Sequence, residues 1–216
     1  MRDAKLHAIK DAKLYIFDMD GTLLDSMPAW AHLGRNYLIR EHITPPADLE
    51  KIIDPMTLQE SAAYFQTLGL DKKTDDIVEE IMSFLREQYR LSIPAKPGML
   101  PLLDVLSKRQ NSILCVLTTS EKDCAIQAFK RLHMLSYFTD IYTSEELGLS
   151  KRTGEIYQTV CAHYDVSCAD TVVFEDALYA IQSAKTAGCY VYAIPDEYSR
   201  ADFDQILTQA DEIFQP

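Results

Sequence analysis

The sequence predicts an α/β protein in which helices cover both faces of a parallel sheet and a second, helical domain is inserted. Three observations predict this class. Short apolar runs alternate with helical patterns in the second half of the chain, the first apolar run ends in two aspartates, and a long stretch without strand signals follows it. The chain of 216 residues, 47% hydrophobic and 25% charged, is long enough for one sizeable core plus an inserted lobe.

Five short apolar runs indicate the strands. They lie at residues 13–18, 112–118, 140–143, 171–176 and 189–194. Segments with apolar residues at three- and four-residue spacing, which predict helices, lie between the later runs at residues 121–134, 153–164 and 177–188. Gly188 is expected to end the last of these helices. This alternation of strand and helix predicts a parallel sheet.

The long stretch after the first strand has the pattern of several helices. They are expected at residues 29–42, in a short piece after "TPPADLEKIID", at 57–69 and at 74–91. Thr57 followed by Glu60 has the spacing of a capping box. We therefore expect a discontinuous α/β core at residues 1–27 and 93–216, and a helical domain at residues 28–92.

Charge and composition narrow the partners. A net charge of −12 and a pI near 4.8 argue against nucleic acid and an anionic membrane as main partners, since both demand a basic face. No stretch approaches the ~18 apolar residues of a membrane span, and the first residues lack the apolar core of a secretion signal. The five cysteines form no CxxC pair and are expected to be reduced and to fill the core. We expect a cytoplasmic protein and a monomer.

Polar side chains collect where the predicted strands end. In open α/β sheets, ligands bind beyond the carboxyl ends of the strands. The residues at this edge are Asp18 and Asp20 after the first strand, Thr118, Thr119 and Ser120 after the second, Lys151 after the third, and Glu175 and Asp176 after the fourth. Taken alone, the residues at each strand end are typical of a loop, a helix cap or the protein surface. Their joint occurrence at successive strand ends predicts a functional site.

The two aspartates of the first strand indicate a cation. If the strand continued through Asp20, Asp18 and Asp20 would point to the same side, and their repulsion would need an external positive charge. Mg²⁺ is a hard cation that prefers oxygen ligands, and the carboxylates of Asp18 and Asp176 suit it. A Mg²⁺ site is therefore expected at this edge.

Four segments resemble the motifs of one family. "FDMDGTLLDS", "LTTS", "SKRTGEIY" and "VVFEDALYAIQSAKTAG" are similar to the four motifs of the haloacid dehalogenase superfamily of phosphohydrolases, in its β-phosphoglucomutase-like branch. The resemblance covers nearly the whole chain, and its first and fourth motifs are the most specific. It implies a Rossmann-like parallel sheet core with an inserted α-helical cap domain.

The resemblance also implies roles for these residues. Asp18 would be a nucleophile that becomes phosphorylated, and Asp20 the general acid and base. Asp18, Asp176 and the backbone carbonyl of Asp20 would bind Mg²⁺. Lys151 would bind phosphate oxygens, together with a hydroxyl of Thr118 or Thr119, of which Thr118 fits the spacing to the next helix better. Glu175 would lie behind these groups.

One departure concerns the third motif. The family often has a Lys-Pro-x-Pro sequence there, whereas this chain continues from Lys151 with Arg152, Thr153 and Gly154. The loop then lacks the rigidity that proline supplies. The placement of Lys151 therefore depends on other contacts.

Several other functions share parts of this pattern. A haloacid dehalogenase needs neither an acid at the position of Asp20 nor a metal. A phosphonate hydrolase of this family uses a cap lysine as a Schiff base, for which Lys51, Lys72 and Lys73 are available. A receiver domain also gathers acids, a hydroxyl and a lysine around Mg²⁺, but its phosphorylated aspartate lies in mid-chain. A non-catalytic phosphate-binding or scaffold protein would not need every catalytic position filled.

A phosphomutase of the β-phosphoglucomutase type is the main alternative. The segment "DPMTLQES" resembles the cap's substrate-specificity loop, where those mutases carry an arginine for a second phosphate, whereas this chain has Met56, Thr57 and Gln59. These three residues are the candidate substrate contacts of the cap. We therefore expect a Mg²⁺-dependent phosphatase that hydrolyses a small phosphorylated metabolite through an aspartyl-phosphate intermediate.

Overall fold

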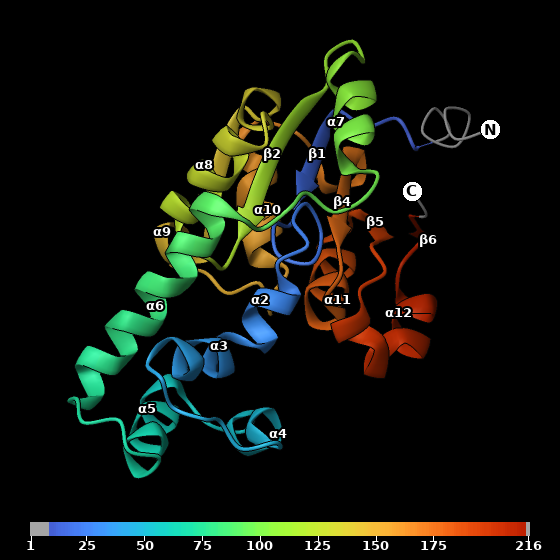
Figure 1. Cartoon of the computed structure of the whole chain (residues 1–216). Coiled ribbons are helices and arrows are strands. Elements are labelled where there is room, and N and C mark those ends of the chain that lie inside the picture. Colours follow the sequence, from blue (N-terminus) through green and yellow to red (C-terminus); the bar gives the residue numbers. More distant parts are fainter. Residues whose placement is uncertain (1–8, 215–216) are drawn as a thin grey trace. The chain divides into compact units, whose positions relative to one another are not determined.

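The core of the protein is a six-stranded sheet in which every strand pair is parallel. The computed structural model describes residues 9–214. The strand order is β3-β2-β1-β4-β5-β6, so the first strand lies in the middle (Figure 1). The strands are β1 (Leu14–Phe17), β2 (Ile113–Thr118), β3 (Asp140–Thr143), β4 (Thr171–Glu175), β5 (Tyr190–Ala193) and β6 (Glu212–Ile213).

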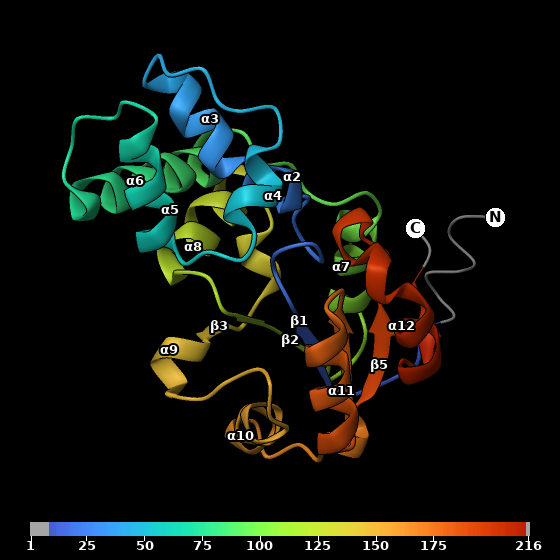
Figure 2. The same ribbon diagram turned by 90° about the horizontal axis from the view of Figure 1, so that it is seen from below.

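Helices and short 3₁₀ turns connect the strands of this core. The helices are α7 (Met99–Ser107), α8 (Lys122–Arg131), α9 (Ser144–Leu147), α10 (Glu155–His163), α11 (Leu178–Ala187) and α12 (Phe203–Gln209). The 3₁₀ turns are η1 (Leu135–Tyr137), η2 (Cys168–Asp170) and η3 (Glu197–Asp202). Helices α10 and α11 lie on one side of the strands and α7 and α8 on the other (Figure 2). The predicted covering of both faces is confirmed.

The burial of β1 follows from this covering. All four of its residues are buried, as expected for a central parallel strand with helices on both faces. Leu14 and Ile16 belong to the apolar cluster beneath α10 and α11. On the other face, Phe17 stacks on Phe174 of β4 with ring centroids 4.6 Å apart, and Phe174 stacks on Tyr192 of β5 at 5.3 Å. This aromatic stack joins three neighbouring strands directly beneath the carboxyl edge.

Some predicted boundaries need correction. Strand β1 ends at Phe17, so Asp18 and Asp20 lie beyond it and the alternation expected for a continuing strand does not apply. Helices α7, α9 and α12 and strand β6 were not predicted. Pro101 disguises α7, but it falls in the first turn, where no intrahelical partner for its nitrogen is needed. Gly188 ends α11 in the left-handed conformation, with φ +94°, as predicted.

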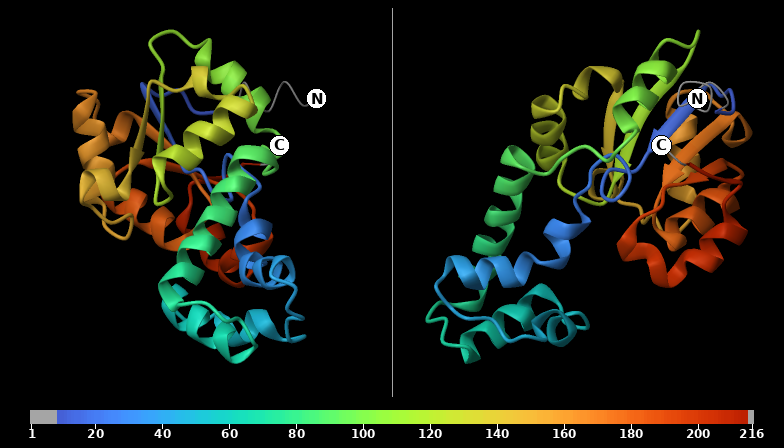
Figure 3. Two further views of the ribbon diagram at one scale, coloured as in Figure 1. Left: turned by 60° about the vertical axis from the view of Figure 1, so that its left-hand side comes forward. Right: turned by 45° about the vertical axis from the view of Figure 1, so that its right-hand side comes forward.

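Among the described residues, 26–93 form a separate helical unit, and 9–25 with 94–214 form the other. The helices of the unit at residues 26–93 are α2 (Met27–Ala31), α3 (Leu33–Arg40), α4 (Leu49–Ile53), α5 (Leu58–Thr67) and α6 (Thr74–Leu91). Helix α6, green in Figure 3, packs along α3 and α5. The helix expected at residues 29–42 is interrupted at His32. Thr57 and Glu60 form the predicted capping box, with both reciprocal hydrogen bonds present.

Among residues 9–214, no helix combines the length and the apolar character needed to cross a bilayer. The longest helix, α6, carries charged residues along its length and buries one apolar face that includes Ile77, Ile81 and Leu85. This pattern is typical of an amphipathic helix that packs on its neighbours.

The aromatic stack predicts a large effect of one substitution. Phe174→Ala removes a fully buried ring from the centre of the sheet, so the free energy of unfolding should fall by about 3–5 kcal/mol. Phe203→Ala, at a residue that is 37% exposed, is the control and should cost under about 1 kcal/mol. Urea unfolding followed by circular dichroism measures both. Equal losses in the two variants would contradict a stabilising role of the stack.

Candidate active site

The carboxyl ends of β1 and β4 bring the first carboxylates together. Phe17 pairs with Phe174 in the register, and the amide of Asp18 donates to the carbonyl of Phe174 at 3.0 Å. Asp18 therefore lies beside the end of β4, where Glu175 and Asp176 follow. Ligand oxygens of these three acids all lie within 4.8 Å of one another. Asp18 is 8% exposed, Glu175 2% and Asp176 4%.

Lys151 supplies positive charge to this group. Its ammonium donates to Oδ1 of Asp18 at 2.7 Å and to Oε2 of Glu175 at 2.5 Å, and the residue is 2% exposed. Burial acts to lower the pKa of Lys151, but the carboxylates of Asp18 and Glu175 more than offset this and hold it well above its ordinary value. Lys151 is therefore a permanent cation in the site.

One lysine does not compensate three buried acids. Burial and the carboxylate of Glu175 raise the pKa of Asp18 to about 8, against the opposing effect of Lys151. Burial and the carboxylates of Glu175 and Asp18 hold the pKa of Asp176 well above its ordinary value. Both pKa shifts have the same two causes, first the burial of the acid and then the negative charge of the neighbouring carboxylates. A bound cation would therefore bring the net charge of the site closer to zero.

A tight turn after β1 shapes the space beside Asp176. Gly21 has φ +83°, a conformation that favours glycine, and a Cβ built there would lie 2.7 Å from Cγ of Asp176. The hydroxyl of Thr22 donates to Oδ1 of Asp176 at 3.2 Å. Position 21 therefore requires glycine for two reasons: the backbone has a positive φ, and the carboxylate of Asp176 leaves no space for a Cβ.

Asp20 is not one of the three buried acids that lie within 4.8 Å of one another. It is half-buried, and its Oδ2 accepts a hydrogen bond from the hydroxyl of Ser120 at 2.6 Å. Sequence reasoning placed Ser120 at the edge but assigned it no role. Its position in "LTTS" two residues after the end of β2 is the signal that points to it.

The two candidate threonines differ in their surroundings. Thr118 ends β2 and is buried, and its hydroxyl oxygen accepts the amide of Ser120 at 3.0 Å. Thr119 is exposed and lines a pocket with Lys151. These positions favour Thr119 as the hydroxyl available to a ligand, whereas spacing alone favoured Thr118.

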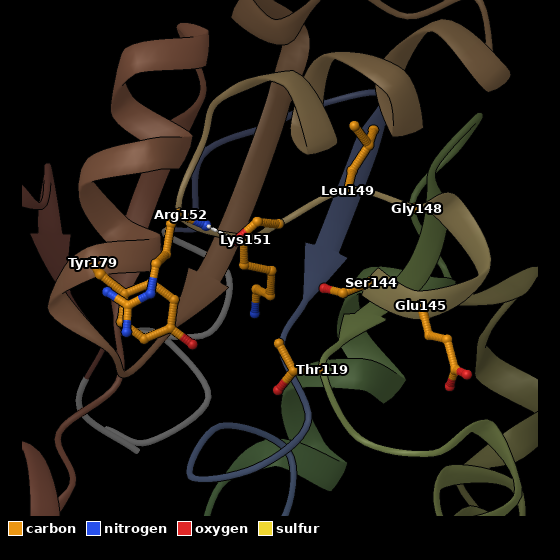
Figure 4. A pocket seen from close by; sticks show the side chains of 9 residues that line it. Thr119, Ser144, Glu145, Gly148, Leu149, Lys151, Arg152 and Tyr179 are labelled. Carbon is orange, nitrogen blue, oxygen red and sulfur yellow. Dashed lines mark hydrogen bonds between the residues drawn. The ribbon is translucent and has the colours of Figure 1, made fainter.

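The pocket beside Lys151 has a volume of about 470 Å³. Figure 4 shows the ammonium of Lys151 pointing toward Thr119, while the guanidinium of Arg152 lies over the ring of Tyr179, 4.5 Å from its centroid. The lining residues are Thr119, Ser144, Glu145, Gly148, Leu149, Ser150, Lys151, Arg152 and Tyr179. The pocket thus opens directly onto the predicted phosphate-binding groups.

Hydrogen bonds replace proline in the loop that carries Lys151. The amide of Arg152 donates to the hydroxyl of Ser150 at 3.2 Å, and the amide of Thr153 donates to the carbonyl of Ser150 at 3.1 Å. Gly154 packs against α11 so closely that a Cβ would lie 3.1 Å from the backbone nitrogen of Ala187. The missing prolines therefore leave the loop with other restraints.

Lys96 is a second residue near the site that the sequence did not indicate. Its ammonium donates to the carbonyl of Gly21 at 2.5 Å and forms an ion pair with Asp196. It thus ties the turn after β1 to the segment after β5. No sequence motif marks Lys96, because its partners are distant along the chain.

The predicted cap contacts belong to the helical unit. Thr57 and Gln59 are exposed and Met56 is half-buried, and the Thr57 hydroxyl is engaged in the capping box. Lys72, considered as a Schiff-base lysine, donates to Glu41 at 2.7 Å and to Glu80 at 2.5 Å. These hydrogen bonds raise the pKa of Lys72, opposite to the change that a Schiff-base lysine needs.

Comparison with known proteins gives the same family. Residues 15–194 match the family described as haloacid dehalogenase-like hydrolase. The chain is 26% identical to validoxylamine A 7'-phosphate phosphatase of Streptomyces hygroscopicus subsp. limoneus, over 94% of this chain and 97% of that protein. It is 25% identical to the β-phosphoglucomutase of Bacillus subtilis, over 93% and 91%. The crystal structure of CbbY from Rhodobacter sphaeroides with phosphate superposes with a TM-score of 0.71 at 20% identity, covering 94% of this chain and 93% of that one.

These findings confirm the predicted resemblance to the β-phosphoglucomutase-like branch and the predicted fold class. They also confirm the prediction of an enzyme of the phosphoric monoester hydrolase class. The chain belongs to the haloacid dehalogenase-like hydrolase family.

Proposed function

We propose that the protein is a Mg²⁺-dependent phosphatase that hydrolyses a small phosphorylated metabolite through an aspartyl phosphate on Asp18. The observation that carries the proposal is the set of three buried carboxylates around the single ammonium of Lys151. Relatives named as phosphatases of phosphorylated carbohydrates support the substrate class. The pocket is lined by Lys151, whose ammonium contacts Asp18, and by Thr119, so it supports a phosphoryl site near the proposed nucleophile.

The donor set suits Mg²⁺. The carboxylates of Asp18 and Asp176 and the backbone carbonyl of Asp20 would supply its protein ligands, with the rest left to water and phosphate. Glycine at position 21 lets the turn after β1 approach the carboxylate of Asp176 closely. When bound, Mg²⁺ neutralises the negative charge of the acids and of the substrate phosphate and polarises the phosphoryl group.

The residues of the chain divide the first step among them. A carboxylate oxygen of Asp18 attacks phosphorus, and the bond from phosphorus to the leaving alcohol oxygen breaks. Asp20 donates a proton to that oxygen. Lys151 and Thr119 hold the other phosphoryl oxygens, so the charge that develops there meets a fixed cation and a hydroxyl.

Hydrolysis of the aspartyl phosphate completes the cycle. Asp20, now ionised, removes a proton from water, which attacks phosphorus. The bond from phosphorus to the Asp18 oxygen breaks and releases inorganic phosphate and the free carboxylate. Ser120 donates to one oxygen of the Asp20 carboxylate and so positions the group that we assign to carry the proton in both steps.

The phosphomutase alternative is supported by the similarity to β-phosphoglucomutase. A mutase must hold a second, non-transferring phosphate, and a bidentate arginine is better suited to that than a hydroxyl or amide. The segment of Met56, Thr57 and Gln59 carries no positive charge. We therefore favour hydrolysis.

Removal of the nucleophile tests the proposed function. Asp18→Asn should reduce release of inorganic phosphate from a panel of phosphorylated sugars, polyols and nucleotides by at least ~1,000-fold, since an amide cannot form the aspartyl phosphate. The exposed carboxylate of Asp123 on α8 gives the control, and Asp123→Asn should retain full turnover. Folding of each variant is checked by thermal melting. A folded Asp18→Asn protein with normal turnover would contradict the proposal.

The hydrogen bond to Asp20 gives a second prediction. Ser120→Ala should lower kcat about tenfold with KM changed less than about twofold, because a hydrogen bond to an ionised group contributes about 1.5 kcal/mol. Ser120→Thr keeps the hydroxyl and should retain most activity, and Ser107→Ala on α7 is the control for loss of an exposed hydroxyl. Steady-state phosphate release measures all three. A rise in KM alone would show that Ser120 binds substrate and does not position Asp20.

A further inference from the structure

Three thiols converge outside the candidate active site. The sulfurs of Cys161, Cys168 and Cys189 all lie within 4.8 Å of one another. Cys161 is on α10, Cys168 begins η2 and Cys189 directly precedes β5. Since β4 and β5 run parallel to β1, Cys168 and Cys189 lie at the amino edge of the sheet, opposite to Asp18. The site is therefore independent of the phosphatase chemistry.

Local backbone structure fixes each of the three cysteines. The carbonyl of Cys161 accepts the amide of Val166 at 3.0 Å, within a turn that contains Asp165 at φ +55°. The Ser167 hydroxyl caps η2, where Cys168 is the first residue. The amide of Cys189 donates to the carbonyl of Ala184 at 3.0 Å. The thiols are thus preorganised by separate elements, which is what a binding site requires.

The group consists of sulfur ligands. Among the described residues, no histidine nitrogen or carboxylate oxygen joins the three sulfurs within 4.8 Å. The hydroxyl of Thr171 lies 3.3 Å from the sulfur of Cys161 and 3.0 Å from the carbonyl of Ser167. The Thr171 hydroxyl donates its proton to the carbonyl of Ser167, so the Thr171 oxygen accepts a hydrogen bond from the Cys161 thiol. Zn²⁺ in structural sites takes four protein ligands, whereas this group offers three.

Because the cysteines are buried, the site favours an ion whose charge makes the complex neutral. Cys161 and Cys189 are each 2% exposed, and a buried net charge without a partner is costly. Three thiolates carry three negative charges, so a monovalent ion would leave a net charge of −2, a divalent ion −1 and a trivalent ion none. Cys168 is half-buried and provides a route from solvent. Softness of sulfur and neutrality of the product both favour a trivalent, thiophilic ion.

We propose that Cys161, Cys168 and Cys189 form a site for a trivalent thiophilic metalloid, for which arsenous acid is the probe. As(OH)₃ is uncharged in neutral solution and reacts with three thiols to give three As–S bonds and three waters. Three S–H and three As–O bonds break, each thiol proton leaves in a water molecule, and no atom changes oxidation state. The reaction therefore needs neither an oxidant nor a reductant.

Native mass spectrometry of the reduced protein tests the stoichiometry. After incubation with arsenite and removal of the excess, the wild-type protein should gain one arsenic atom and lose three hydrogens. Arsenic held by two thiols retains a hydroxyl, so that adduct is one water heavier. X-ray absorption of the complex should show three sulfur neighbours and no oxygen neighbour. An adduct that is one water heavier than expected for three As–S bonds, or an oxygen neighbour of arsenic, would overturn the proposal.

Variants locate the site. Cys168→Ser, at the least buried of the three thiols, should weaken arsenite binding at least about tenfold and give only the heavier adduct, since one of three bonds is lost. Cys124→Ser, on α8, removes a buried thiol outside the group and should bind arsenite as the wild type does. Equal binding by both variants would overturn the assignment. Preferential retention of equimolar Zn²⁺ or Cu⁺ over arsenite would overturn the choice of a trivalent ion.

Discussion

The candidate active site depends on one electrostatic constraint, the confinement of three carboxylates around a single buried ammonium. Lys151 contacts Asp18 and Glu175 directly, and both of those acids lie within 4.8 Å of Asp176. At 4 Å and an effective dielectric constant near 20, each pair of like unit charges repels by about 4 kcal/mol. A substrate phosphate would add to that repulsion. A divalent cation at these acids therefore removes repulsion within the protein and between the protein and its substrate.

The fold holds this arrangement by using one edge of a parallel sheet. Strands β1 and β4 are hydrogen-bonded neighbours, so Asp18 and Glu175 arrive together without long loops. The aromatic stack of Phe17, Phe174 and Tyr192 fixes the strands beneath them. The remaining groups come from restrained turns: Gly21 approaches Asp176, and Ser150 holds the loop that carries Lys151. Rigid placement matters because phosphoryl transfer depends mainly on position and electrostatics.

The sequence predicts best the features that are local. Apolar runs, the capping box of Thr57 and the stop at Gly188 depend on neighbours along the chain, and the structure has them as predicted. Helix α7 was missed because a proline and an almost wholly apolar sequence hide its periodicity. Lys96 and the three-cysteine group depend on contacts between distant segments, which no spacing reveals. The position of Ser120 follows from its place after β2, but its hydrogen bond to Asp20 is also a contact between distant segments. The choice between Thr118 and Thr119 likewise depended on the residue at which β2 ends.

Thermal melting of the wild-type protein and the Asp176→Asn variant, each with Mg²⁺ and with a chelator, measures whether the three carboxylates carry excess negative charge. If the carboxylates carry excess charge that Mg²⁺ neutralises, Mg²⁺ should raise the Tm of the wild type, in line with a stabilisation of about 2.7 kcal/mol at 100 times its Kd. The variant should melt no lower than the wild type in the chelator, because it has lost a buried and uncompensated acid, and its Tm should not respond to Mg²⁺. An equal response of both proteins to Mg²⁺, or a variant that melts well below the wild type in the chelator, would contradict the account.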